Sequence, residues 1–158
     1  MRSERGFTLV EAVVAMTIFS FVAVLVAALY LHGYQNYSRE SDRIEVQENL
    51  RLAASMMVAR IRQGTTIKVY SSSGPPNVQN TGPWIEFNDG TGGFRFDAVG
   101  REIEEKNDSR WQPLASNIKS LVFKYDEDRK IVFISMTGEK GRSDPVSLTT
   151  EVHLRVSQ

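Results

Sequence analysis

The sequence contains no cysteine in its 158 residues, which excludes a disulfide framework and a thiolate zinc site. It also lacks an excess of either charge: 19 basic and 19 acidic residues give a formal net charge of zero. A neutral chain has no overall electrostatic attraction for nucleic acid, and we expect no nucleic-acid partner. Its length suits one small domain with an appendage.

Residues for catalysis are scarce as well. His32 and His153 are the two histidines, and neither stands in a metal-ligand spacing or an evident triad. Residues 138–143 lack the G-x-x-x-x-G-K-[ST] order of a phosphate loop, and residues 90–93 fit a hairpin turn better than a dinucleotide site. We therefore expect no catalytic residue, no cofactor and no enzyme activity.

What the sequence does contain is a long apolar run from Ala12 to Leu31 without a charged residue. Such a run has the helical length of a bilayer's hydrocarbon core, about 30 Å, and indicates a single transmembrane segment. Arg2 and Arg5 precede it, so the positive-inside rule places the N-terminus in the cytoplasm and the remainder outside.

A secretory signal peptide is the main alternative, with residues 26–28 as a weak small-residue cleavage site. The run is longer than the roughly 7–15 apolar residues of such a signal. Helical patterning also continues beyond it, which favours a membrane anchor.

Directly before the span, residues 6–11 read GFTLVE. This motif, after a basic leader and before an apolar helix, resembles the processing site of type IV prepilins and type II secretion pseudopilins over about the first thirty residues. The resemblance implies that residues 1–6 are a leader, that prepilin peptidase cuts between Gly6 and Phe7, and that Phe7 is then N-methylated. Without a Cβ atom, Gly6 lets the backbone approach a protease closely.

Glu11 is a carboxylate one turn into an apolar helix, where a charge is costly and marks a functional site. The resemblance implies that Glu11 of one subunit neutralises the Phe7 amine of a neighbour and so sets the docking register. The alternative is that Glu11 only reaches the cytoplasmic headgroups.

Beyond the span, apolar residues recur at helical spacing, which extends the helix over residues 7–63. The predicted core stripe is Val46, Leu50, Ala54, Met57 and Ile61. Gln63-Gly64 predicts the helix end.

Residues 64–158 then read as a β-rich head. The predicted strands are Trp84–Asn88, Phe94–Val99, Leu121–Tyr125, Ile131–Met136 and Val146–Val156, with weaker ones at Ile67–Ser71 and Arg101–Glu105. A polar turn at 125–130 makes 121–136 a hairpin, and the last three strands an antiparallel meander. We expect an α+β fold, with the long helix packed on an antiparallel sheet.

Two further features bear on which kind of pilin-like subunit the chain resembles. Major pilins often carry Gly or Pro early in the spine, whereas residues 7–31 contain neither, and residues 114–125 resemble the late hairpin entry of J-type pseudopilins. The chain is therefore most similar to a minor pilin or pseudopilin, with a major pilin and a single-pass membrane sensor as alternatives. Asp126, Glu127 and Asp128 read as a solvated turn, although loops of some pseudopilins bind calcium there.

The resemblance implies a filament serving secretion, pilus assembly or DNA uptake. The implied partners are other pilin or pseudopilin subunits, prepilin peptidase, the inner-membrane assembly platform and the lipid bilayer. The implied location is the inner membrane and then an extracytoplasmic filament. Lys140 and Arg142 are too few to indicate a DNA-binding tip subunit.

Overall fold

The structure is a computed structural model that describes residues 8–71, 75, 77–107 and 110–154. The chain divides into two compact units, Met1–Ser38 and Arg39–Gln158. The described part of the first unit is almost entirely helix, and the second unit contains the head.

Helix α1 runs from Leu9 to Arg62 and belongs to both units. Its end confirms the predicted stop, because Gly64 N donates to Ile61 O at 2.9 Å directly after the last helical residue. Arg60 and Arg62 occupy the last turn, where cations interact favourably with the helix dipole.

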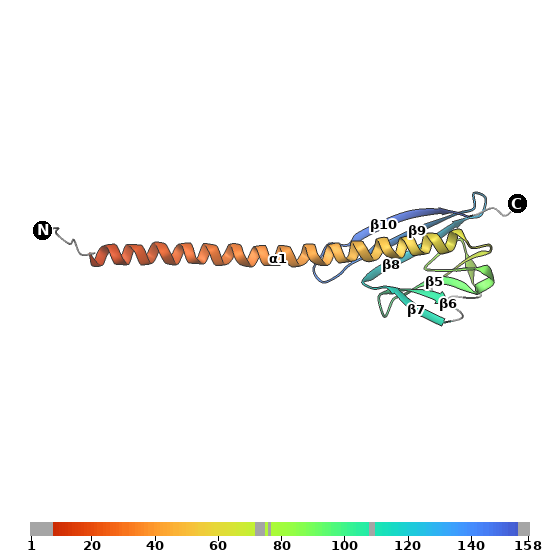
Figure 1. Ribbon diagram of the computed structural model, residues 1–158, viewed down its shortest axis with the longest axis horizontal. Coiled ribbons are helices and arrows are strands. Elements are labelled where there is room, and N and C mark those ends of the chain that lie inside the picture. Colours follow the sequence, from red (N-terminus) through yellow and green to blue (C-terminus); the bar gives the residue numbers. More distant parts are fainter. Residues whose placement is uncertain (1–7, 72–74, 76, 108–109, 155–158) are drawn as a thin grey trace. The chain divides into compact units, whose positions relative to one another are not determined.

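The head is built from two antiparallel sheets (Figure 1). The six-stranded sheet has the order β2-β1-β4-β5-β6-β7, and the four-stranded sheet has the order β10-β9-β8-β3. The strands are β1 Ile67–Tyr70, β2 Val78–Gln79, β3 Thr81–Gly82, β4 Trp84–Phe87, β5 Gly92–Asp97, β6 Glu102–Asn107, β7 Arg110–Ala115, β8 Ile118–Asp126, β9 Ile131–Gly138 and β10 Val146–His153. The short 3₁₀ helix η1 covers Asn88–Gly90 in the β4–β5 connection.

These elements confirm the α+β class, the hairpin and the final meander, since β8 pairs with β9 and β9 with β10, all antiparallel. The expected single sheet is two sheets in the structure. The chain changes sheet at Pro83, between β3, which pairs with β8, and β4, which pairs with β1. Proline has no N–H to donate to a strand ladder, which suits the change of sheet.

The structure also has a strand that the sequence analysis did not predict. β7 contains Pro113, a residue that argues against a central strand. It forms the edge of the six-stranded sheet, where a proline is tolerated.

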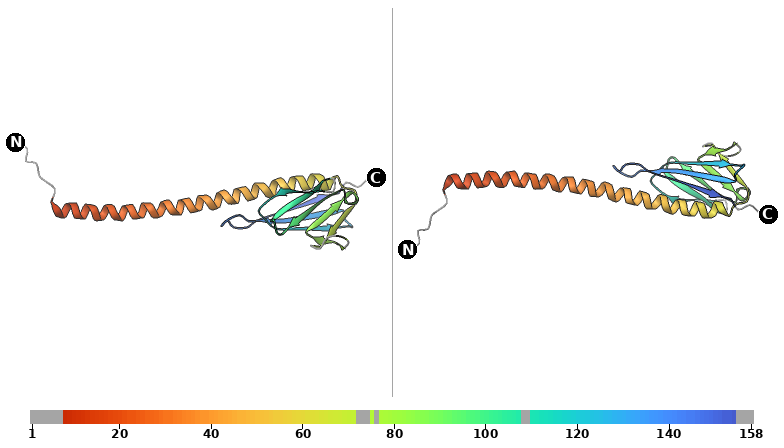
Figure 2. Two further views of the ribbon diagram at one scale, coloured as in Figure 1. Left: turned by 90° about the horizontal axis from the view of Figure 1, so that it is seen from below. Right: turned by 90° about the horizontal axis from the view of Figure 1, so that it is seen from above.

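The head core lies between the C-terminal part of α1 and both sheets, beside which α1 runs in both views of Figure 2. All five residues of the predicted stripe are buried. Phe94 and Ile103 meet them from the six-stranded sheet, and Phe123 and Ile134 from the four-stranded sheet. Ion pairing adds to this contact, because Arg60 Nε lies 3.1 Å from Glu105 Oε1.

Gly82 permits the close approach of the two sheets. A Cβ atom at Gly82 would lie 1.9 Å from the carbonyl oxygen of Tyr70 in β1, which is a backbone atom of the other sheet. Only a residue without a side chain fits there.

Two leucines on α1 allow a matched test of the core. Leu50 is 0% exposed and Leu52 is 58% exposed. We expect Leu50→Ala to lower the free energy of unfolding by about 2–5 kcal/mol, because it leaves a cavity, and Leu52→Ala by less than about 1 kcal/mol. Urea unfolding followed by tryptophan fluorescence measures both, and equal losses would contradict the packing described here.

Candidate functional site

The start of α1 is closed by a reciprocal pair of side chains. Thr8 precedes the first helical residue, and its Oγ1 accepts a hydrogen bond from Glu11 N at 3.3 Å. In return, Glu11 Oε2 accepts from Thr8 N at 3.4 Å and from Thr8 Oγ1 at 3.3 Å. This T-x-x-E arrangement is a capping box, which satisfies backbone donors left free at a helix start.

The sequence analysis assigned Glu11 to subunit docking and did not identify this role. The signal was present as Thr8 followed three residues later by Glu11, directly before an apolar run. The capping box holds the carboxylate at the first turn. Both of its hydrogen bonds use Oε2, so Oε1 accepts none from the described residues.

No ion pair joins Glu11 to a cation within the part of the chain that the structure describes. The predicted processing residues Gly6 and Phe7 lie outside the described residues. The geometry therefore shows a carboxylate fixed at a helix start, with one oxygen available to a donor from another molecule.

The apolar part of α1 that follows Glu11, here called the bare segment, is exposed along its length. An 18-residue stretch of it is long and apolar enough to cross a membrane, and none of that stretch is buried. Large apolar side chains such as Phe19 and Leu29 are more than 70% exposed. Water is a poor solvent for this surface, so it calls for lipid or other apolar partners.

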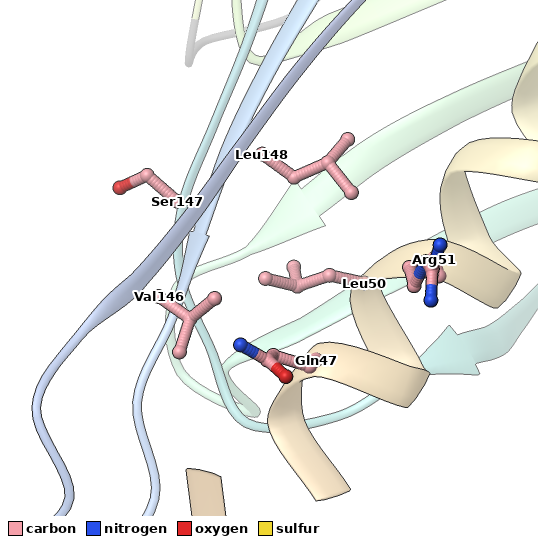
Figure 3. A pocket seen from close by; sticks show the side chains of 6 residues that line it. All are labelled: Gln47, Leu50, Arg51, Val146, Ser147 and Leu148. Carbon is pink, nitrogen blue, oxygen red and sulfur yellow. The ribbon is translucent and has the colours of Figure 1, made fainter. Parts of the chain in front are cut away.

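The head has a groove of mixed polar and apolar lining between α1 and the edge strand β10 (Figure 3). Its volume is about 270 Å³, and Leu50 extends into it from the helix while Leu148 extends from the strand. Gln47 and Arg51 line the helix side, and Val146 and Ser147 line the strand side. Arg51 is the one charged residue in its lining.

Ion pairs join the turn between β9 and β10 to α1 and to β8. Lys140 Nζ lies 2.6 Å from Glu45 Oε2 on α1, and this hydrogen bond raises the pKa of Lys140. Lys119 Nζ lies 2.7 Å from Glu139 Oε2 and lowers the pKa of that carboxyl. Lys140 therefore holds the β9–β10 turn against α1 through its ion pair with Glu45.

The outer face of the six-stranded sheet carries interlocked aromatic and charged side chains. The Arg95 guanidinium carbon lies 4.4 Å from the centre of the Trp111 ring, and Trp84 meets Trp111 edge-on at 5.3 Å. Burial, with the Glu86 carboxylate beside it, raises the pKa of Tyr70 in the same layer. Sequence patterns gave no sign of this cluster, because its members come from four different strands.

The two histidines and the acidic turn weighed from the sequence lie on different elements. His32 lies on α1 and His153 on β10, where His153 Nε2 is 3.7 Å from Glu151 Oε1. Asp126 Oδ1 accepts a hydrogen bond from Arg129 N in the β8–β9 turn. No group of three or more potential metal ligands occurs among the residues described.

Comparison with known proteins matches residues 1–27 to a family described as the prokaryotic N-terminal methylation motif. The match covers the motif, the capping box and most of the bare apolar segment. No curated protein and no solved structure matches the chain.

The capping box predicts a local effect of Thr8→Ala. Loss of the cap costs about 1 kcal/mol of helix stability, which corresponds to about fivefold faster amide hydrogen exchange at Glu11 and Ala12. Thr8→Ser keeps the hydroxyl and should exchange at the native rate. Exchange measured by NMR in detergent micelles tests this, and equal rates for both variants would show that the cap contributes nothing.

Proposed function

We propose that this chain, whose N-terminal motif is the type IV pilin and pseudopilin signal, is a minor subunit of a pilus-like filament. The motif supports a pilin-like or pseudopilin precursor and points to a structural subunit rather than an enzyme. In this proposal prepilin peptidase cuts between Gly6 and Phe7, and Phe7 becomes the N-methylated end.

The observation that carries the proposal is the overlap of the motif with the bare end of α1. Residues 1–27 match the methylation motif, and among the described residues none covers a face of the helix within them. A membrane anchor that later leaves the membrane as part of a filament needs such an exposed apolar surface. Its apolar surface meets lipid first and the helices of other subunits afterwards.

Glu11 supplies the docking chemistry in this proposal. Cleavage at Phe7 creates an amine, and an amine and a carboxylate in an apolar environment each have a high desolvation cost unless they pair. The free Oε1 of Glu11 suits an amine from a neighbouring subunit, while Oε2 remains bound in the capping box. One carboxylate then fixes the helix start of its own chain and the axial position of the next.

The proposed location follows from the same segment. A motif of this kind with a long apolar helix fits a membrane-anchored protein that later enters an extracellular filament. We propose that Ala12–Leu31 crosses the inner membrane once, with the N-terminus in the cytoplasm and residues 64–158 as the extracytoplasmic head. Other subunits, prepilin peptidase, the assembly platform and lipid are the partners.

Two features support a minor pilin or pseudopilin over a major pilin. α1 is continuous from Leu9 to Arg62, without the early Gly or Pro that major pilins often carry. The head also has no cysteine. The proposed machine is one for secretion, pilus assembly or DNA uptake.

Processing has a direct test. In cells with active prepilin peptidase, N-terminal sequencing of the membrane-extracted protein should begin at Phe7 with a methylated residue. Cells that lack the peptidase provide the control and should keep the residues before Phe7. An uncleaved chain in cells with the active peptidase would overturn the proposal.

Docking has a separate test. We expect Glu11→Ala to reduce incorporation into filaments at least about tenfold, because the unpaired amine costs more than about 1.4 kcal/mol, while cleavage proceeds. Glu48→Ala changes an exposed glutamate on the same helix and should leave incorporation unchanged. Immunoblots of sheared filaments and of membranes measure both pools.

A normal filament content of the Glu11→Ala variant would contradict the docking role. It would favour the membrane-sensor alternative, which needs no subunit contact at Glu11.

A further inference from the structure

Three tyrosines form a stripe on one face of α1 in the first unit. Tyr30, Tyr34 and Tyr37 are separated by four and three residues, a spacing that places their side chains on the same side of a helix. They are 72%, 66% and 74% exposed. Within the described residues, no hydrogen bond or ring contact uses them.

The stripe begins where the apolar run ends. No Asp, Glu, Lys or Arg occurs from Ala12 to Ser38, a stretch of 27 residues, and Arg39 and Glu40 are the first charges beyond it. At 1.5 Å per residue this stretch is about 40 Å long, which matches a bilayer with its headgroup regions rather than the hydrocarbon core alone. The tyrosines occupy about 10 Å at its far end, enough to cover one headgroup layer of about 5–8 Å and the adjoining edge of the hydrocarbon core.

Tyrosine suits this position chemically. Its ring is apolar and its hydroxyl needs a polar partner, so it is enriched where a membrane meets water. Between the tyrosines lie the polar residues His32, Gln35 and Asn36 together with Leu31 and Gly33, and none of these is Asp, Glu, Lys or Arg. This composition fits the headgroup region, which tolerates polar groups on all sides of the helix.

We propose that Tyr30, Tyr34 and Tyr37 anchor α1 in the outer headgroup layer and set the depth of the span before filament assembly. This inference rests on the proposed single membrane span. A neighbouring helix is the less suitable partner, because close helix contacts in membranes favour small residues over three large rings. The anchor holds the span at a fixed depth, which keeps Glu11 at the same level in every subunit awaiting assembly.

The absence of cysteine allows a clean depth measurement in the full chain. Ala28→Cys, labelled with a nitroxide, reports depth on the face away from the tyrosines, in vesicles of phosphatidylcholine with 14- or 22-carbon acyl chains. Collision with oxygen and with a water-soluble nickel complex gives the label's depth. The test variant replaces all three tyrosines with serine.

We expect the native label to keep its distance from the outer headgroups in both bilayers. Without the tyrosines, it should shift by about 3 Å or more, two residues of helix rise. Replacement of the tyrosines with tryptophan should restore the native depth, since both side chains prefer the interface. The matched control changes His32, Gln35 and Asn36 to serine and should leave the depth unchanged.

An unchanged depth in the tyrosine-to-serine variant would overturn the anchor while leaving the span intact. Native depth combined with a loss of filament incorporation would also overturn it, and would assign the stripe to a subunit contact. A separate label at Ser20→Cys tests the span itself. Nickel access to that label in the native chain would refute the membrane span, an outcome distinct from failure of the anchor.

Discussion

One helix in this protein must satisfy two different environments, and the rest of the structure depends on that constraint. In the head, α1 buries a stripe from Val46 to Ile61 against two sheets, while its apolar N-terminal part is exposed in the portion of the chain that the structure describes. The covered part needs neighbours of fixed shape, which the sheets supply. The bare part needs a solvent that accepts apolar surface on every side, and a filament offers the same condition through other helices.

Much of the fold was predictable from the sequence because helical periodicity is strong over long segments. The stripe that includes Leu50 and Met57 was predicted from spacing alone, and every member is buried. The helix end at Gly64 and the β8–β9 hairpin were also predicted, because local turn chemistry determines both. The processing motif needed only six consecutive residues, and the family match covers them.

Other features depend on contacts between distant segments, which periodicity does not encode. The division into two sheets follows from the close approach at Gly82, whose neighbour Tyr70 lies in another strand. Lys140 was weighed only as a possible DNA-binding charge, whereas its partner in the structure is Glu45, 95 residues earlier in the chain. The capping box is different, because it was local and visible in the sequence. It was missed because the resemblance already implied docking for Glu11, and the proposal gives this one carboxylate both roles.

Gly93 has a consequence for how the head meets other molecules. It stands between Glu86 and Lys106 in the register of the six-stranded sheet, and without a side chain there Lys106 Nζ reaches Glu86 at 2.9 Å across the intervening strand. Arg95 and Glu104 pair in the same layer. The charges of this face therefore cancel locally, so it exerts little long-range attraction on approaching proteins.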